Sequence, residues 1–243
     1  MIATPCRISS PCADRSPFQT GNDDTARYLF ETAQQIECEQ AGSSEVIGML
    51  PELGDGALAR GDLETAARYY EDALRIGKIK PWRWKEMFAQ HGLGLTRQLR
   101  GDDARARTLF EAALVTAREM QTPEPITYAA SSLAITAARQ GDRPTAWAAL
   151  REALGASQTL HVDHLRPLTA AAYLAAAEGD DRTAAQISGL LITRWRGDRV
   201  YRVLLDRLVT ALREQLGAST YQVLADAGAA LQPEEVAAGL VGD

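Results

Sequence analysis

Hydrophobic positions recur three and four residues apart over most of the chain, the spacing of an amphipathic α-helix. The pattern predicts a first helix over 23–40, and a longer helix over 199–216 followed by short ones over 219–228 and 233–240. Between them it predicts helix pairs over 45–60 with 62–77, 82–99 with 103–120, 124–139 with 143–155, and 162–178 with 181–195. Residues 1–20 are rich in Pro, Ser and Cys without periodicity, which predicts a disordered N-terminal segment.

A Gly-Asp step returns at intervals of about 40 residues and separates the two helices of each predicted pair. Glycine tolerates the left-handed conformation that ends a helix. An aspartate directly after it caps the next helix and complements the helix dipole. The four steps are Gly61-Asp62, Gly101-Asp102, Gly141-Asp142 and Gly179-Asp180.

Residue size also repeats around each of these glycines. A small residue lies seven positions before the glycine, an alanine lies five positions after it, and a large residue lies nine positions after it in the first three units. The small residues let two antiparallel helices approach closely, and the large residue fills the space between them. The fourth unit departs from the pattern, because Ser188 stands where the others have Tyr70, Phe110 and Leu150.

This arrangement resembles the tetratricopeptide repeat (TPR), a helix–turn–helix unit of 34 residues, over about residues 46–195. The period here is nearer 40, and the usual proline after the second helix is absent, so we expect divergent repeats. The resemblance implies an all-α fold, a TPR-like right-handed superhelix of antiparallel helix pairs (an α-solenoid). We expect the disordered segment over 1–20, the repeats over 21–197 and C-terminal capping helices over 198–243.

Two stretches of the sequence resemble one particular group of TPR-containing proteins. Residues 101–114, followed by Ala117-Arg118-Glu119, resemble the TPR arrays of the LuxR-type and AfsR-type signal-transduction ATPases of bacteria. Residues 208–237, with Gly217, Tyr221 and Leu231 among them, are similar to the closing helices of those arrays. In that family the repeats follow a nucleotide-binding module, often with a DNA-binding domain. The sequence contains no Gly-x-x-x-x-Gly-Lys-Ser/Thr loop, so we expect the scaffold or sensor part alone, as a stand-alone protein or a truncated reading frame.

Composition limits the function classes. The chain is 46% apolar and 24% charged with a net charge of -6, typical of a soluble globular protein and unfavourable for nucleic-acid binding. No run of 18 apolar residues predicts a membrane span, and the N-terminus lacks the apolar core of a signal peptide, so a cytoplasmic location is expected. Cys6, Cys12 and Cys38 form no Cys-x-x-Cys pair, which predicts free thiols.

Few side chains in the sequence are candidates for catalysis, for metal binding or for nucleic-acid binding. His161-Val-Asp163-His164 offers fewer ligands than a metal site needs, and Asp163 serves equally well as a helix cap. The basic aromatic stretches 78–85 and 194–196 suit base stacking, or equally the packing of inter-repeat loops. We therefore predict no catalytic residue, cofactor or metal.

The remaining candidate is the surface of the array, because the first helix of each repeat lines a concave face. Its mixture of aromatic, polar and apolar groups suits a peptide or an amphipathic helix, although the same residues are also candidates for interior contacts. The leading hypothesis is a non-enzymatic scaffold for protein–protein contact in bacterial transcriptional signalling; the alternative is a sensor of a small effector. The residues that the repeat register places in the groove are Phe88, His91, Leu95, Tyr128, Ser131, Ile135, Arg166, Thr169 and Tyr173.

Overall fold

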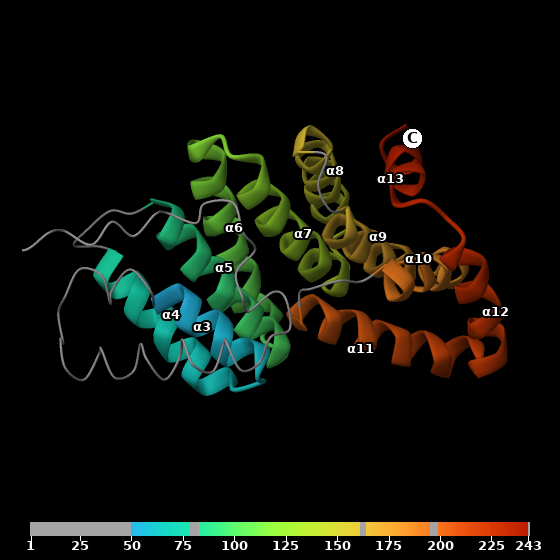
Figure 1. The fold of residues 1–243 in the computed structure, drawn as a ribbon, viewed down its shortest axis with the longest axis horizontal. Helices are drawn as coiled ribbons and strands as arrows, with labels where there is room; N and C mark the ends of the chain where they lie inside the picture. The colour runs from blue at the N-terminus through green and yellow to red at the C-terminus, as the bar shows by residue number, and fades with distance from the viewer. Residues whose placement is uncertain (1–49, 78–82, 161–163, 195–198, 243) are drawn as a thin grey trace, which may run out of the picture.

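The computed structural model describes residues 50–77, 83–160, 164–194 and 199–242, and no described residue lies in a strand (Figure 1). The all-α class is therefore confirmed for this part of the chain, while the expectations for 1–20 and 23–40 fall outside the described residues. The helices are α3 (Leu50–Ala59), α4 (Leu63–Gly77), α5 (Arg83–Leu99), α6 (Asp103–Met120), α7 (Pro123–Arg139), α8 (Arg143–Leu160), α9 (Leu165–Ala177), α10 (Asp181–Arg194), α11 (Arg199–Leu216), α12 (Ala218–Ala229) and α13 (Pro233–Gly242).

Most predicted boundaries agree with these helices to within two residues. Two differ more. The helix α8 runs on to Leu160 instead of ending at 155, and α9 begins at Leu165, the alternative start that Pro167 indicates, instead of 162. The start predicted at 45 lies outside the described residues. Pro167 then lies in the first turn of α9, where a proline's missing N–H removes no helical hydrogen bond.

The Gly-Asp steps form the turns that the sequence predicts. All four glycines have a left-handed backbone, with φ between 75° for Gly141 and 83° for Gly179. The turn is closed by backbone bonds of the type seen in the second step, where the Asp102 N–H donates to the carbonyl of Arg97 at 2.9 Å. Each aspartate side chain caps the next helix by accepting the backbone N–H three residues on, at Thr65, Arg105, Thr145 and Thr183.

The size pattern corresponds to close helix packing within the first two pairs. A Cβ atom added to Gly54 would lie 2.5 Å from the Tyr70 ring, and one added to Gly94 would lie 2.5 Å from the Phe110 ring. Both rings are completely buried. Glycine is therefore required at these positions because the ring of the partner helix occupies the space of a side chain.

The departure at Ser188 coincides with a different neighbour. Here α12 packs against α10, and both helices carry a glycine at the crossing. Gly189 faces the backbone of Ala225, and Gly228 faces the backbone of Gln186, so neither position has room for a Cβ atom. Ser188 is itself fully buried, and its hydroxyl donates to the Ala184 carbonyl of its own helix at 2.7 Å.

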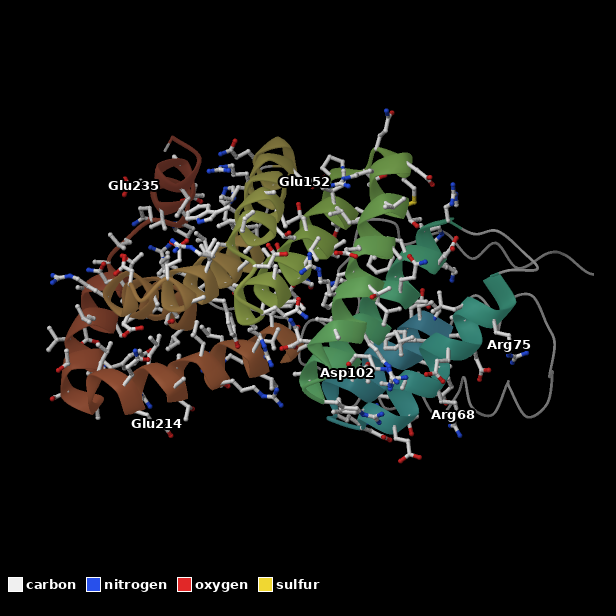
Figure 2. All side chains as sticks on the ribbon, turned by 180° about the vertical axis from the view of Figure 1, so that it is seen from behind. Arg68, Arg75, Asp102, Glu152, Glu214 and Glu235 are labelled. Carbon is white, nitrogen blue, oxygen red and sulfur yellow. The ribbon has the colours of Figure 1, made fainter. Side chains whose placement is uncertain are left out.

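The helices pack in chain order, each pair against the next, and the first helices α3, α5, α7 and α9 contact one another in succession. After α10, the long helix α11 lies along the array, contacting α9 and also α3 (Figure 1). Charged side chains such as Arg68, Arg75 and Glu214 point outward from the helices (Figure 2). No described helix combines the length and apolar character needed to cross a bilayer.

Candidate functional site

The helices α5, α7 and α9 bring side chains from the predicted groove together on one surface, which we call the inner face. Its centre is the Tyr128 ring of α7. The Phe88 and His91 rings of α5 lie 6.1 and 6.2 Å from it, and the Arg166 guanidinium of α9 stacks at 3.8 Å from its centroid. The inner face is defined here by Phe88, His91, Tyr128, Ser132, Arg166 and Tyr173.

The other predicted groove residues lie inside the helix packing. Ser131, Ile135 and Thr169 are completely buried, and Leu95 is 5% exposed. The Thr169 hydroxyl donates to the Leu165 carbonyl of its own helix at 2.7 Å. These side chains therefore hold the array together and are not available to a ligand in this structure.

A buried chain of polar groups crosses the inner face. The His91 Nε2 and Ser132 Oγ atoms are hydrogen-bonded at 2.9 Å. The Ser132 Oγ is also bonded at 2.6 Å to the hydroxyl of Tyr201, which lies 3.4 Å from the Tyr128 carbonyl. Because Tyr201 belongs to α11, this series of hydrogen bonds ties α11 to α5 and α7.

Two further hydrogen bonds fix α11 on the inner face. The Tyr173 hydroxyl donates to the Leu204 carbonyl of α11 at 2.7 Å. The Arg207 guanidinium of α11 donates to the Leu99 carbonyl at the end of α5 at 3.1 Å. The first half of α11 is thus bonded to α5, α7 and α9.

The helix α11 is strongly amphipathic. One side carries buried side chains at helical spacing, while Val203 on the other side is 42% exposed and Arg202 forms an ion pair with Asp206 at 2.9 Å. The structure therefore places an amphipathic helix of the same chain on the inner face. The buried side chains of α11 are Val200, Tyr201, Leu204, Leu205, Leu208, Val209 and Leu212.

The tyrosines of the inner face remain protonated to high pH. Burial raises the pKa of Tyr128 to about 12, partly offset by the nearby Arg166 charge. Burial likewise raises the pKa of Tyr173 to about 12. Both hydroxyls therefore act as hydrogen-bond donors, Tyr128 to the Glu124 carboxylate and Tyr173 to α11.

One edge of the inner face remains open. Trp84, at the start of α5, is 47% exposed and meets Phe88 edge to face at 5.7 Å between ring centroids. The Lys85 ammonium lies 4.8 Å from the Trp84 ring. Of the basic aromatic stretches, Lys78–Trp82 and Trp195-Arg196 lie outside the described residues, whereas the Arg194 guanidinium bonds to Gln232.

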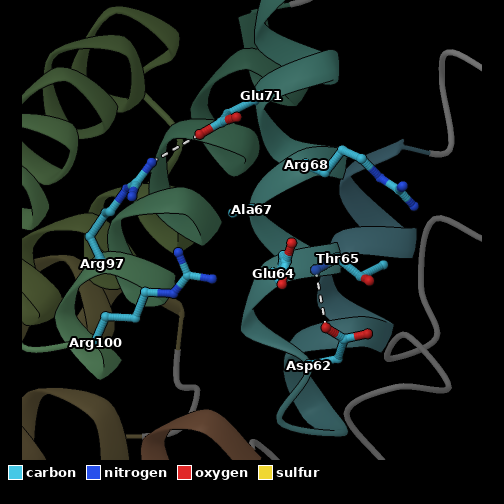
Figure 3. A pocket seen from close by; sticks show the side chains of 8 residues that line it. All are labelled: Asp62, Glu64, Thr65, Ala67, Arg68, Glu71, Arg97 and Arg100. Carbon is cyan, nitrogen blue, oxygen red and sulfur yellow. Dashed lines mark hydrogen bonds and ion pairs between the residues drawn. The ribbon is translucent and has the colours of Figure 1, made fainter.

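A second concave feature lies between α4 and α5, with a volume of about 550 Å³ (Figure 3). Arg97 and Arg100 face α4 across it, and Arg97 forms an ion pair with Glu71 at 2.9 Å. Arginine and acidic side chains balance one another in its walls. The lining residues are Asp62, Glu64, Thr65, Ala67, Arg68, Glu71, Arg97 and Arg100.

The contact between His91 and Ser132 has the spacing of a general base and a nucleophile. Ser132 is completely buried, however, and its hydroxyl is also bonded to Tyr201, so no substrate reaches it while α11 is in place. In the described residues, no three His, Cys, Asp or Glu side chains gather as a metal site. His161 and Asp163 lie outside those residues, and the His164 Nδ1 is 3.0 Å from the Ser157 Oγ.

Comparison of the sequence with protein-family models and with curated proteins gives no match. The resemblance to the repeat arrays of bacterial signal-transduction ATPases therefore stays a prediction. Sequence reasoning identified the α5, α7 and α9 positions of the inner face from the repeat register. It missed Ser132 and Tyr201, and the signal for Tyr201 was the dense apolar face of the helix that carries it.

Proposed function

We propose that this chain is a non-enzymatic, TPR-like scaffold whose inner face binds an amphipathic helix of a partner protein. The family resemblance suggests a bacterial signalling or transcriptional context. The observation that supports the proposal is the position of α11. This amphipathic helix lies across α5, α7 and α9 and is hydrogen-bonded to all three, so a helix fits the inner face.

The contacts of α11 follow the recurring pattern of helix-in-groove recognition, in which anchors one turn apart enter a groove. Tyr201, Leu204 and Leu208 are such anchors, separated by one turn each. Burying an apolar side chain of this size contributes about 1.5–3 kcal/mol. Three to five such anchors on a partner helix therefore offset a large part of the association cost of roughly 4–15 kcal/mol.

A site-specific photo-crosslinking experiment tests this proposal. A photoreactive amino acid replaces Trp84 at the open edge of the inner face, and in a control chain it replaces Val115, which is 51% exposed on α6. In cells of the native host, the Trp84 position is expected to cross-link to a discrete protein that the Val115 position does not capture. Identical patterns from both positions, or no protein adduct from either, would count against a protein-binding inner face.

The cleft between α4 and α5 favours a second candidate function, the sensing of a small effector. Its volume of about 550 Å³ falls in the range of small-molecule sites. Arg100 and Glu64 line it, which suits a molecule with both signs of charge. A thermal-shift screen of charged metabolites tests this candidate, since a ligand of the folded state raises Tm. The rise in Tm should be lost in the Arg100→Ala variant. Equal rises in the variant and in the unmodified chain would exclude the cleft as the binding site.

A further inference from the structure

We infer that α11 is an internal ligand that regulates the inner face, so that a partner helix binds only by replacing it. This inference rests on the proposed function and adds two statements to it: how the face is controlled, and what pattern the partner helix carries. That pattern begins with an aromatic side chain that carries a hydroxyl. Counted from it, leucines follow at positions three, four and seven, and an arginine follows at position six. In α11 these residues are Tyr201, Leu204, Leu205, Leu208 and Arg207.

The helix α11 packs against α9, α10 and α12, while α12 packs more extensively against α10 than against α11. The next helix, α12, has an anchor of its own, the backbone contacts of Gly189 with Ala225 and of Gly228 with Gln186. Gly217 joins α11 to α12 with a φ of 81°, a conformation that a residue with a side chain rarely adopts. A change of backbone angles at Gly217 therefore allows α11 to leave the inner face while α12 stays on α10.

The polar groups under α11 determine which helix can replace it. Without α11, the Ser132 hydroxyl, the Tyr173 hydroxyl and the Leu99 carbonyl all lose a hydrogen-bond partner. A helix that covers these groups without bonding to them leaves buried polar atoms unsatisfied, which strongly disfavours the complex. A helix with the α11 pattern restores the bonds to Ser132 and Leu99 through its side chains and the bond to Tyr173 through its backbone.

Tethering sets the strength of the regulation. A segment attached to the same chain competes at an effective concentration on the order of millimolar. A free helix therefore binds with an apparent Kd that is raised in inverse proportion to the fraction of molecules in which α11 has left. Weakening the contacts of α11 alone should increase that fraction and so tighten the binding of a free helix.

A peptide-binding experiment on the full chain tests the inference. The probe is a fluorescent synthetic peptide of residues 199–216, titrated with the unmodified chain, with Tyr201→Ala, and with Val203→Ala as a control on the outer side of α11. We expect Tyr201→Ala to bind the peptide at least about ten-fold more tightly than the other two. A peptide that itself carries Tyr201→Ala should bind each chain more weakly. Equal affinities for all three chains, or equal binding of both peptides, would overturn the inference.

A second measurement requires no substitution in the chain and so does not depend on a variant that folds. The unmodified chain is mixed with excess peptide 199–216 whose leucines carry heavy isotopes, and amide hydrogen exchange is followed by mass. Exchange in the chain's own α11 is expected to rise with peptide concentration, while exchange in α7 and α12 stays constant. No change in α11 at saturating peptide would show that the helix is a fixed part of the core.

The two proposals fail in different ways. Peptide exchange at α11 without any protein cross-linked at Trp84 would leave an internal ligand but overturn partner binding as the function. A protein captured at Trp84 by a chain whose α11 never exchanges would support partner binding at the open edge of the inner face and overturn the regulation by α11.

Discussion

The close approach of α5 and α6 gives a quantitative prediction for Gly94→Ala. A Cβ atom at this position would lie 2.5 Å from the Phe110 ring, a separation that real Cβ atoms do not show. Phe110 is completely buried, so the ring or the helix must move. Overpacking of this kind costs about 1–3 kcal/mol.

The helix propensity of alanine acts in the opposite direction, and a control glycine measures it. Gly155 lies within α8 and has open space around it, so Gly155→Ala gains about 1 kcal/mol from propensity alone. The same gain applies to Gly94→Ala. The difference in the free energy of unfolding between the two variants therefore isolates the packing cost, which we expect to be about 1–3 kcal/mol.

Urea unfolding of the two variants and the unmodified chain provides the assay. Their midpoints give the difference in stability, provided that the dependence on denaturant is unchanged. In a Phe110→Leu background the penalty of Gly94→Ala should shrink, because the smaller side chain leaves room for the methyl group. If Gly94→Ala stabilised the chain as much as Gly155→Ala does, the close packing inferred for this pair would be wrong.

Three further predictions concern the caps and the titrating groups. Asp102→Ala removes the cap at Arg105 and should cost about 1 kcal/mol of unfolding free energy, measured in urea. The pKa of Asp62 is lowered, chiefly by the hydrogen bond from the backbone N–H of the residue three positions on. Its stabilising effect is therefore complete above about pH 4 and is lost as pH falls. Asp62→Asn should reduce the decrease of the urea midpoint at acid pH. Burial raises the pKa of Tyr128 and Tyr173 to about 12, above an unfolded value of about 10, so stability should decline as pH rises from 10 to 12. Tyrosinate absorbance should show a late-titrating component that Tyr173→Phe reduces, and a single titration near pH 10 would contradict it.

The turns and pairings of the repeat were predictable because their causes are local. A left-handed glycine such as Gly101 and a capping carboxylate such as Asp102 act within a few residues of the chain. The fit of Gly94 to Phe110 follows from the same short-range register, since both positions are fixed relative to one turn. Such features are visible in one sequence without any knowledge of the distant packing.

The place of α11 was not predictable in the same way. A repeat register relates each helix to its neighbours in the chain, whereas Tyr201 meets Ser132 and Arg207 meets Leu99 across long separations in sequence. The sequence carried one hint, the apolar face of α11. That face does not state which surface the helix covers, because that choice depends on the shape of the assembled array.

The proposed function and its regulation both depend on the packing of α11 against α7. A double-mutant cycle between Tyr201→Phe and Ser132→Ala measures it directly, because the two side chains share a buried hydrogen bond of 2.6 Å. We predict a coupling in the free energy of unfolding of about 0.5–1.5 kcal/mol. Effects that add within about 0.3 kcal/mol would contradict the account, since two side chains that do not touch contribute independently.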